Sequence, residues 1–141
     1  MIVEKQIRDY LHSLPEAKRT EMETLHSFIL KHSPDLKLWF LDGRDENNKV
    51  VSNPNIGYGS LKMKYADGKT KEFYRVGISA NSTGISVYIM GIEDKNYLME
   101  TFGATIGKAT VTGYCIKFKK NKDIDLATLQ SAITYGLQTN R

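Results

Sequence analysis

The hydrophobic period of this sequence changes along the chain, and that change constrains the fold more than any other feature. Near the start, apolar side chains recur at helical spacing, as in Val3, Ile7, Tyr10 and Leu11. From Gly57 onward, apolar and polar side chains alternate with a period of two, which is typical of half-buried strands. The order predicts an α+β fold, in which helices cover one face of a mostly antiparallel sheet of four or more strands.

Two helices are expected before the alternating region. Ser13 is expected to cap the second helix, which has Pro15 in its first turn and ends at Ser33-Pro34. One apolar stripe of this helix should face the core, formed by Met22, Leu25, Phe28, Ile29 and His32.

Two further helices are expected near the end of the chain. The first covers 94–102, with Asp94 as its cap and Gly103 as its stop. The last begins near Asp123, and its apolar face consists of Leu126, Leu129 and Ile133. Both are expected on the same face of the sheet as the first two helices.

A long connection is expected over 33–56, which is rich in Asp, Asn and Gly and shows no period of its own. Loops of this length in compact domains are usually functional or mobile. Trp39 and Phe40 stand at its start and are expected to anchor it to the core.

The turns predict how the strands pair. A two-residue turn at Asp67-Gly68 sets Leu61 opposite Tyr74, so that the apolar residues of both strands share one face. A second turn at Asn81-Ser82 likewise sets Ile78 opposite Ile85.

This pairing predicts a second sheet face that carries cations among aromatic side chains. Its expected members are Ser60, Lys62, Lys64, Lys71, Phe73, Arg75, Ser86, Tyr88 and Met90. A fourth strand over 114–119, with Tyr114, Ile116 and Phe118 inward, adds Cys115, Lys117 and Lys119. The face is either the solvated side of a one-sided sheet or a platform for an anionic ligand. In the second case, the candidate ligand-binding residues on it are Lys62, Lys64, Arg75, Tyr88 and Lys117.

The charge distribution is compatible with both interpretations. The chain has a net charge of +4, with eight basic and nine acidic residues in 1–55 and twelve and seven in 56–141. Such an excess indicates an anionic partner, either a small anion or nucleic acid, only where it gathers on one face. Otherwise it describes an ordinary solvated surface.

No motif predicts a catalytic residue, a metal ligand or a cofactor. The run Gly103–Thr110 is not a nucleotide-binding loop, because its glycines are one residue too close and Ala109 replaces the hydroxyl that binds magnesium. Lys108, beside glycine amides, is a further candidate to bind a single anion. The three histidines do not pair at the i, i+4 spacing of a helical metal site.

The single Cys115 cannot form an internal disulfide, which indicates a reducing compartment. The chain begins with charged residues instead of a signal peptide, and its apolar runs are far shorter than the ~20 residues of a membrane span. A single cytoplasmic domain over 1–141, with no membrane partner, is therefore expected.

Several segments resemble the YdhG-like domain family, and together they cover nearly the whole chain. They are the helix pair from Ile7 to Pro34, Asn55–Gly59, Tyr65–Gly68, Gly84–Gly91, Gly107–Ala109, Cys115–Lys120 and Asp123–Asp125. The family is a domain of unknown function, so the resemblance implies a fold, with two N-terminal helices, a sheet and a C-terminal helix.

Three functions remain open at this point. The first is a non-catalytic binding or accessory domain that takes an anion on the basic face or at Lys108. The second is an iron-binding chaperone, because some YdhG-like proteins have been likened to frataxin. Frataxin-like binding uses an acidic helix and strand edge, whereas the first two helices here are charge-balanced. The third is an enzyme whose site no motif reveals.

Overall fold

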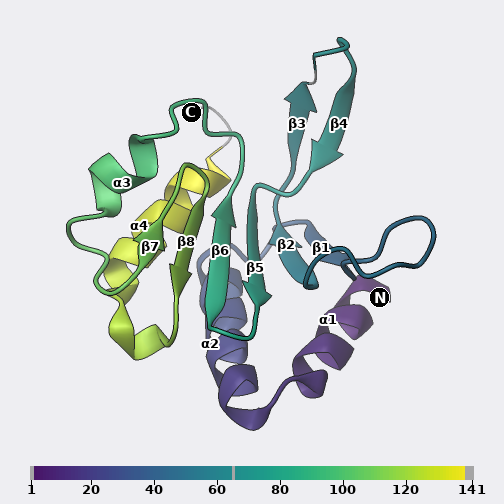
Figure 1. Cartoon of the computed structure of the whole chain (residues 1–141), viewed down its shortest axis with the longest axis horizontal. Coiled ribbons are helices and arrows are strands. Elements are labelled where there is room, and N and C mark those ends of the chain that lie inside the picture. The colour runs from purple at the N-terminus through teal and green to yellow at the C-terminus, as the bar shows by residue number, and fades with distance from the viewer. Residues whose placement is uncertain (1, 65, 139–141) are drawn as a thin grey trace.

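A computed structural model describes residues 2–64 and 66–138, and its helices and strands form two layers (Figure 1). The described α-helices are α1 (Ile2–Ser13), α2 (Glu16–His32), α3 (Tyr97–Phe102) and α4 (Leu126–Leu137), with a 3-10 turn at Asn121–Asp123. The described strands are β1 (Leu38–Leu41), β2 (Asn55–Tyr58), β3 (Leu61–Lys64), β4 (Thr70–Phe73), β5 (Val76–Ala80), β6 (Ile85–Ile89), β7 (Thr110–Val111) and β8 (Cys115–Phe118). These elements confirm the expected α+β fold, with two N-terminal helices and a C-terminal helix.

The strands form two antiparallel sheets. Six of them make the main sheet, in the order β1-β2-β5-β6-β8-β7, while β3 and β4 make a separate hairpin that projects beyond it (Figure 1). The fourth predicted strand is present as β8, and the short edge strand β7 has no counterpart in the sequence prediction.

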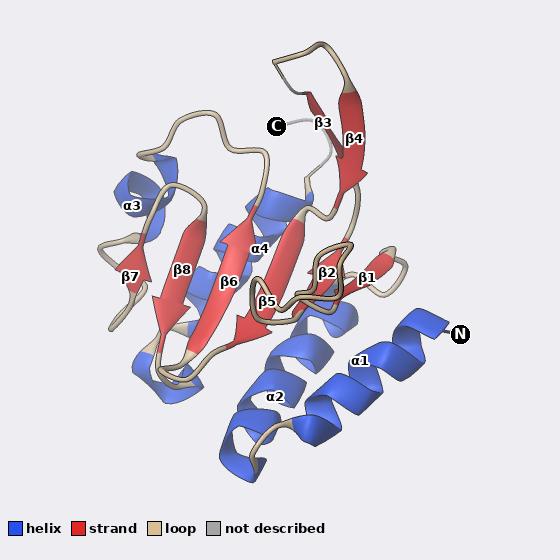
Figure 2. Cartoon of the chain, turned by 45° about the vertical axis from the view of Figure 1, so that its right-hand side comes forward, coloured by secondary structure: helices blue, strands red, loops and turns tan. Residues whose placement is uncertain are grey.

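The helices cover one face of the main sheet, and the core lies between the two layers (Figure 2). Ile56, Ile78, Val87 and Ile116 point into this core together with Leu25 of α2. The alternate strand residues form the opposite face, which we call the open face. It includes Gly57, Gly77, Ser79, Ser86, Tyr88, Cys115 and Lys117.

The first helix boundary differs from the prediction. Ser13 is the last residue of α1, and its hydroxyl donates to the Tyr10 carbonyl 2.6 Å away instead of capping the next helix. α2 begins directly after Pro15, whose fixed φ suits a helix start. The predicted end of α2 at Ser33 is confirmed.

β1 lies inside the segment that the sequence predicted as one long connection. It pairs with β2, so that Phe40 lies opposite Ile56 and Trp39 opposite Gly57. Phe40 packs on Tyr10 of α1, with ring centroids 5.6 Å apart, and it anchors the segment to the core as expected. Trp39 lies on the open face, so it does not reach the core.

The predicted pairing around Asp67-Gly68 is wrong by one residue. Leu61 lies opposite Phe73, not Tyr74, because the chain bends between β4 and β5 and the two strands belong to different sheets. The predicted alternation also included Tyr65, which lies outside the described residues. The ring of Tyr74 lies over Gly57 and Gly77 on the open face, opposite to its predicted side.

The second predicted pairing is wrong by two residues, because a four-residue loop replaces the expected two-residue turn. Ile78 lies opposite Val87, and Ala80 lies opposite Ile85. A shift of two residues leaves every side chain on the same face. The predicted inward faces of these strands are therefore confirmed.

No helix in the described part of the chain has both the length and the apolar character that crossing a lipid bilayer demands.

Candidate anion-binding site

A cavity of about 460 Å³ lies at one end of the main sheet, where three segments meet. These are the Asn81–Gly84 loop before β6, residues 108–110 at the start of β7, and residues 117–119 at the end of β8. They converge because antiparallel pairing places Ile85 beside Phe118 and Thr110 beside Lys117.

Three lysines line this cavity: Lys108 before β7, Lys117 within β8 and Lys119 directly after β8. We call it the lysine pocket. The described residues that line it include no carboxylate. Three lysines around one concave surface whose described lining has no acid create a positive potential that attracts anions.

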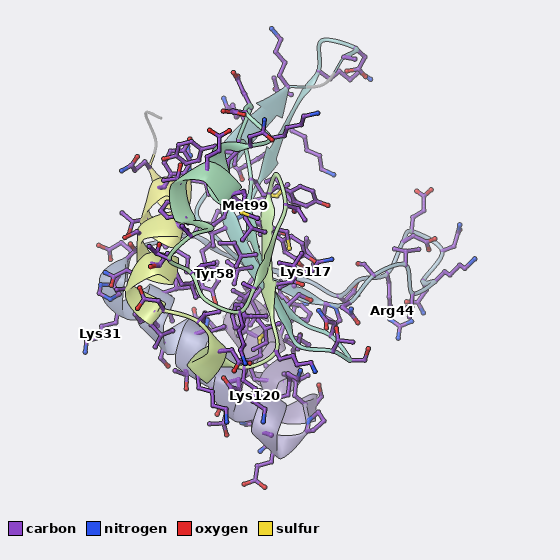
Figure 3. All side chains as sticks on the ribbon, turned by 60° about the vertical axis from the view of Figure 1, so that its left-hand side comes forward. Lys31, Arg44, Tyr58, Met99, Lys117 and Lys120 are labelled. Carbon is purple, nitrogen blue, oxygen red and sulfur yellow. The ribbon has the colours of Figure 1, made fainter. Side chains whose placement is uncertain are left out.

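Lys117 lies in β8, a strand that is paired on both sides. It lies between Ser86 of β6 and Thr110 of β7, to which its strand is paired on both sides. Figure 3 shows it on the side of the sheet away from α4, whereas Tyr58 lies between the sheet and the helices. The ammonium group is therefore presented to solvent from a fixed backbone.

Lys108 is positioned by backbone contacts to the segment before α4. Its amide donates to the Asp123 carbonyl at 2.9 Å, and Gly107 forms an isolated bridge with Ile124. Gly107 has φ +101, and a Cβ there would lie 2.6 Å from the Asp123 carbonyl oxygen. Glycine is required at this close approach, and it brings the next residue, Lys108, to the pocket.

The Asn81–Gly84 loop is closed by its own first side chain. Asn81 Oδ1 accepts from the amides of Thr83 and Gly84 at 2.9 and 2.8 Å. From α2, the ammonium group of Lys18 donates to the carbonyls of Asn81 and Gly84, at 3.2 and 3.1 Å. This loop therefore forms a firm wall, and Lys18 adds a fourth positive charge behind it.

The structure brings together two of the predicted ligand-binding residues, Lys108 and Lys117. A third, Tyr88, shares the open face with Lys117, as predicted, but it is not among the residues that line the pocket. Sequence reasoning missed the contribution of Lys18, because its position beside the loop depends on how α2 packs. The sequence predicted a turn within Asn81–Gly84, but it did not predict that this turn lies beside Lys108.

The other three predicted residues lie elsewhere. Lys62 and Lys64 belong to β3, where they pair with Glu72 and Thr70 in the projecting hairpin. Arg75 lies at the bend after β4, and its guanidinium donates to the Gln138 carbonyl at 2.7 Å. The predicted single platform of Lys62, Lys64, Arg75 and Tyr88 is therefore wrong, because the bend separates the hairpin from the main sheet.

Tyr114 also differs from its predicted inward position. It lies just before β8, is 54% exposed, and stacks on Tyr88 with ring centroids 6.1 Å apart. Cys115 follows it and is buried, and burial raises the pKa of its thiol. A protonated, buried thiol is a poor nucleophile.

The described residues contain no group of three or more His, Cys, Asp or Glu side chains that could hold a metal ion. Comparisons with known proteins gave no relative: no family model, no curated protein and no solved structure matches this chain.

Proposed function

We propose that this protein is a cytoplasmic binding or accessory domain that takes a phosphate-like anion in the lysine pocket. One observation carries the proposal: Lys108, Lys117 and Lys119 line one cavity, and no carboxylate is among its described lining residues. The buried, unpaired Cys115 is in keeping with a reducing compartment.

The pocket suits an oxyanion for two reasons. Lysine ammonium groups each offer three donors to a tetrahedral anion. The backbones that hold Lys108 and Lys117 are already fixed by the contacts with Asp123 and by strand pairing, so binding orders side chains only. The volume of about 460 Å³ leaves room for more than a single phosphate group.

The test is isothermal titration calorimetry with inorganic pyrophosphate at low and at physiological salt. The wild-type protein should bind pyrophosphate, and the affinity should fall as salt rises, because exposed charges are screened. Lys117→Gln should weaken binding roughly tenfold, since a hydrogen bond to a charged group contributes about 1.5–3 kcal/mol.

Lys62→Gln and Lys64→Gln are matched controls, because each removes one exposed positive charge from the projecting hairpin. These variants should bind pyrophosphate like the wild type. Equal weakening by Lys62→Gln and Lys117→Gln would show that net charge alone attracts the anion, and absence of binding at low salt would refute the proposed function.

A further inference from the structure

A row of side chains crosses the open face directly beside the lysine pocket. Strand pairing places Trp39, Gly57, Gly77, Tyr88 and Cys115 in one line across five strands. The two glycines in this line lie under the ring of Tyr74. Tyr114 stacks on Tyr88 at the end of this line. We call Trp39, Tyr74, Tyr88 and Tyr114 the aromatic row.

Only one end of this row offers an exposed ring. Tyr74 is 4% exposed and serves to fill the sheet surface over the glycines. Tyr114 is 54% exposed, and its ring stacks on Tyr88 at an interplanar angle of 18°. Stacking on Tyr88 holds the Tyr114 ring in place, so Tyr114 presents an oriented aromatic surface to solvent.

The exposed ring and the lysine pocket lie toward opposite ends of the four-residue strand β8. Ser79, Ser86, Lys117 and Thr110 form the next line on the same face, two residues along each strand from Gly77, Tyr88 and Cys115. Two residues of a strand span about 7 Å. Lys117 is therefore about one such step from Tyr88 and Cys115, and Tyr114 lies one residue further away along the chain. None of the residues in either line is acidic.

A ligand that fills both places needs an anionic group joined to a planar ring by a linker that spans the stretch from Lys117 to Tyr114. A phosphorylated nucleoside has this layout, because the sugar joins the phosphate to the base. Bases stack on aromatic side chains irrespective of their identity, since every base has a π-face. Single-stranded nucleic acid and free nucleotides share this unit.

We propose that the site recognises phosphorylated nucleosides, with the phosphate in the lysine pocket and the base on the exposed ring of Tyr114. The inference rests on the proposed function, because it adds base recognition to a phosphate site. Lys117 contacts the phosphate, and Tyr88 supports the stacking ring from behind.

The test compares adenosine 5′-monophosphate with ribose 5-phosphate, which carries the same phosphate and sugar but no base. In calorimetry at low salt, the wild-type protein should bind the nucleotide at least about fivefold more tightly, the lower limit for one stacked base. Tyr114→Ala should abolish this difference and leave ribose 5-phosphate binding unchanged. Tyr114→Trp should keep it. Lys117→Gln should weaken both ligands alike.

Tyr97→Ala is a matched control, because Tyr97 also belongs to a stacked tyrosine pair, with Tyr135, its ring centroid 4.4 Å away. It should retain the full preference for the nucleotide. Equal affinities of the wild type for the two ligands, or a preference that survives Tyr114→Ala, would overturn the inference. If pyrophosphate binds in that case, the proposed function stands by itself; if pyrophosphate also fails to bind, both fall.

A second arm identifies the source of the nucleoside. Fluorescence anisotropy with a labelled eight-residue oligothymidylate measures single-stranded nucleic acid directly. Tighter binding than the mononucleotide, with a steep salt dependence, would identify nucleic acid, because each neutralised phosphate releases counterions. Binding no tighter than that of the mononucleotide would identify free nucleotides. In both cases, Tyr114→Ala should bind the preferred ligand more weakly than the wild type does.

Discussion

A polar contact joins α2 to β2 at the boundary of the core. Tyr58 is fully buried, and its hydroxyl lies 2.7 Å from Nδ1 of His26, which is partly buried at the helix surface. Burial raises the pKa of Tyr58 well above its usual value and lowers the pKa of His26 below 6.5. Both side chains are therefore neutral near pH 7, and one hydrogen bond joins the hydroxyl to the imidazole, with its donor set by the imidazole tautomer.

This pair predicts a loss of stability on mild acidification. Below pH 6.5 the unfolded chain protonates His26 more readily than the folded chain, so the free energy of unfolding falls as the pH falls. His26→Gln keeps a hydrogen-bond partner for Tyr58 and removes the titration. Thermal denaturation should show a smaller decrease in Tm between pH 7 and pH 5 for this variant than for the wild type.

His12→Asn is the control, because His12 is exposed on α1. It should keep the wild-type decrease in Tm. An unchanged decrease in His26→Gln would show that other groups account for the pH dependence.

At the scale of the elements, two glycines shape the open face. Gly57 and Gly77 lie opposite each other in β2 and β5, and the Tyr74 ring covers both. A Cβ on Gly77 would lie 2.6 Å from Cε1 and Cζ of that ring. Because both strands have glycine at these positions, the Tyr74 ring can pack directly on their backbones.

Gly77→Ala should destabilise the protein by about 1–3 kcal/mol, because the new methyl group forces Tyr74 out of its place. Without this clash, alanine would be favoured over glycine in a strand. Urea denaturation measures the effect. In a Tyr74→Ala background the same substitution should cost much less, and equal costs in the two backgrounds would exclude the clash.

At the scale of the whole molecule, the six-stranded sheet and its helices form the packed body, and the β3–β4 hairpin extends from it (Figure 1). Thr70, Lys71 and Glu72 of β4 are exposed, whereas every residue of β5 is buried. An isolated two-stranded hairpin is only marginally stable in water. The hairpin and the body should therefore open with different free energies.

Hydrogen exchange measures this difference. Amides of β5 and β6 should exchange at least ~100-fold more slowly than those of β3 and β4, because the former open only with the core. Lys37, the residue before β1, bridges to the hairpin through an exposed ion pair with Glu72, which adds little stability. Uniform protection across these four strands would contradict the division.

Local signals in the sequence determined the helices, most of the strands and most of the faces, but not β1 or β7. The apolar spacing of Ile7, Tyr10 and Leu11 specified α1, and strict alternation specified β6 and the inward side of Ile116. These signals succeed because burial of one face imposes the period of the element on its own residues. Even the wrong turn before β6 left its faces correct, since the error was two residues.

The candidate site depended on the tertiary structure. Lys108 and Lys117 were both predicted to bind an anion, but only strand pairing and the bridge from Gly107 to Ile124 place them around one pocket. Tyr74 was assigned to the wrong face because alternation assumes an unbroken strand, and the bend beside it is decided by where β3 and β4 leave the main sheet. Periodicity describes a residue relative to its chain neighbours, whereas a site is made by residues that packing brings together.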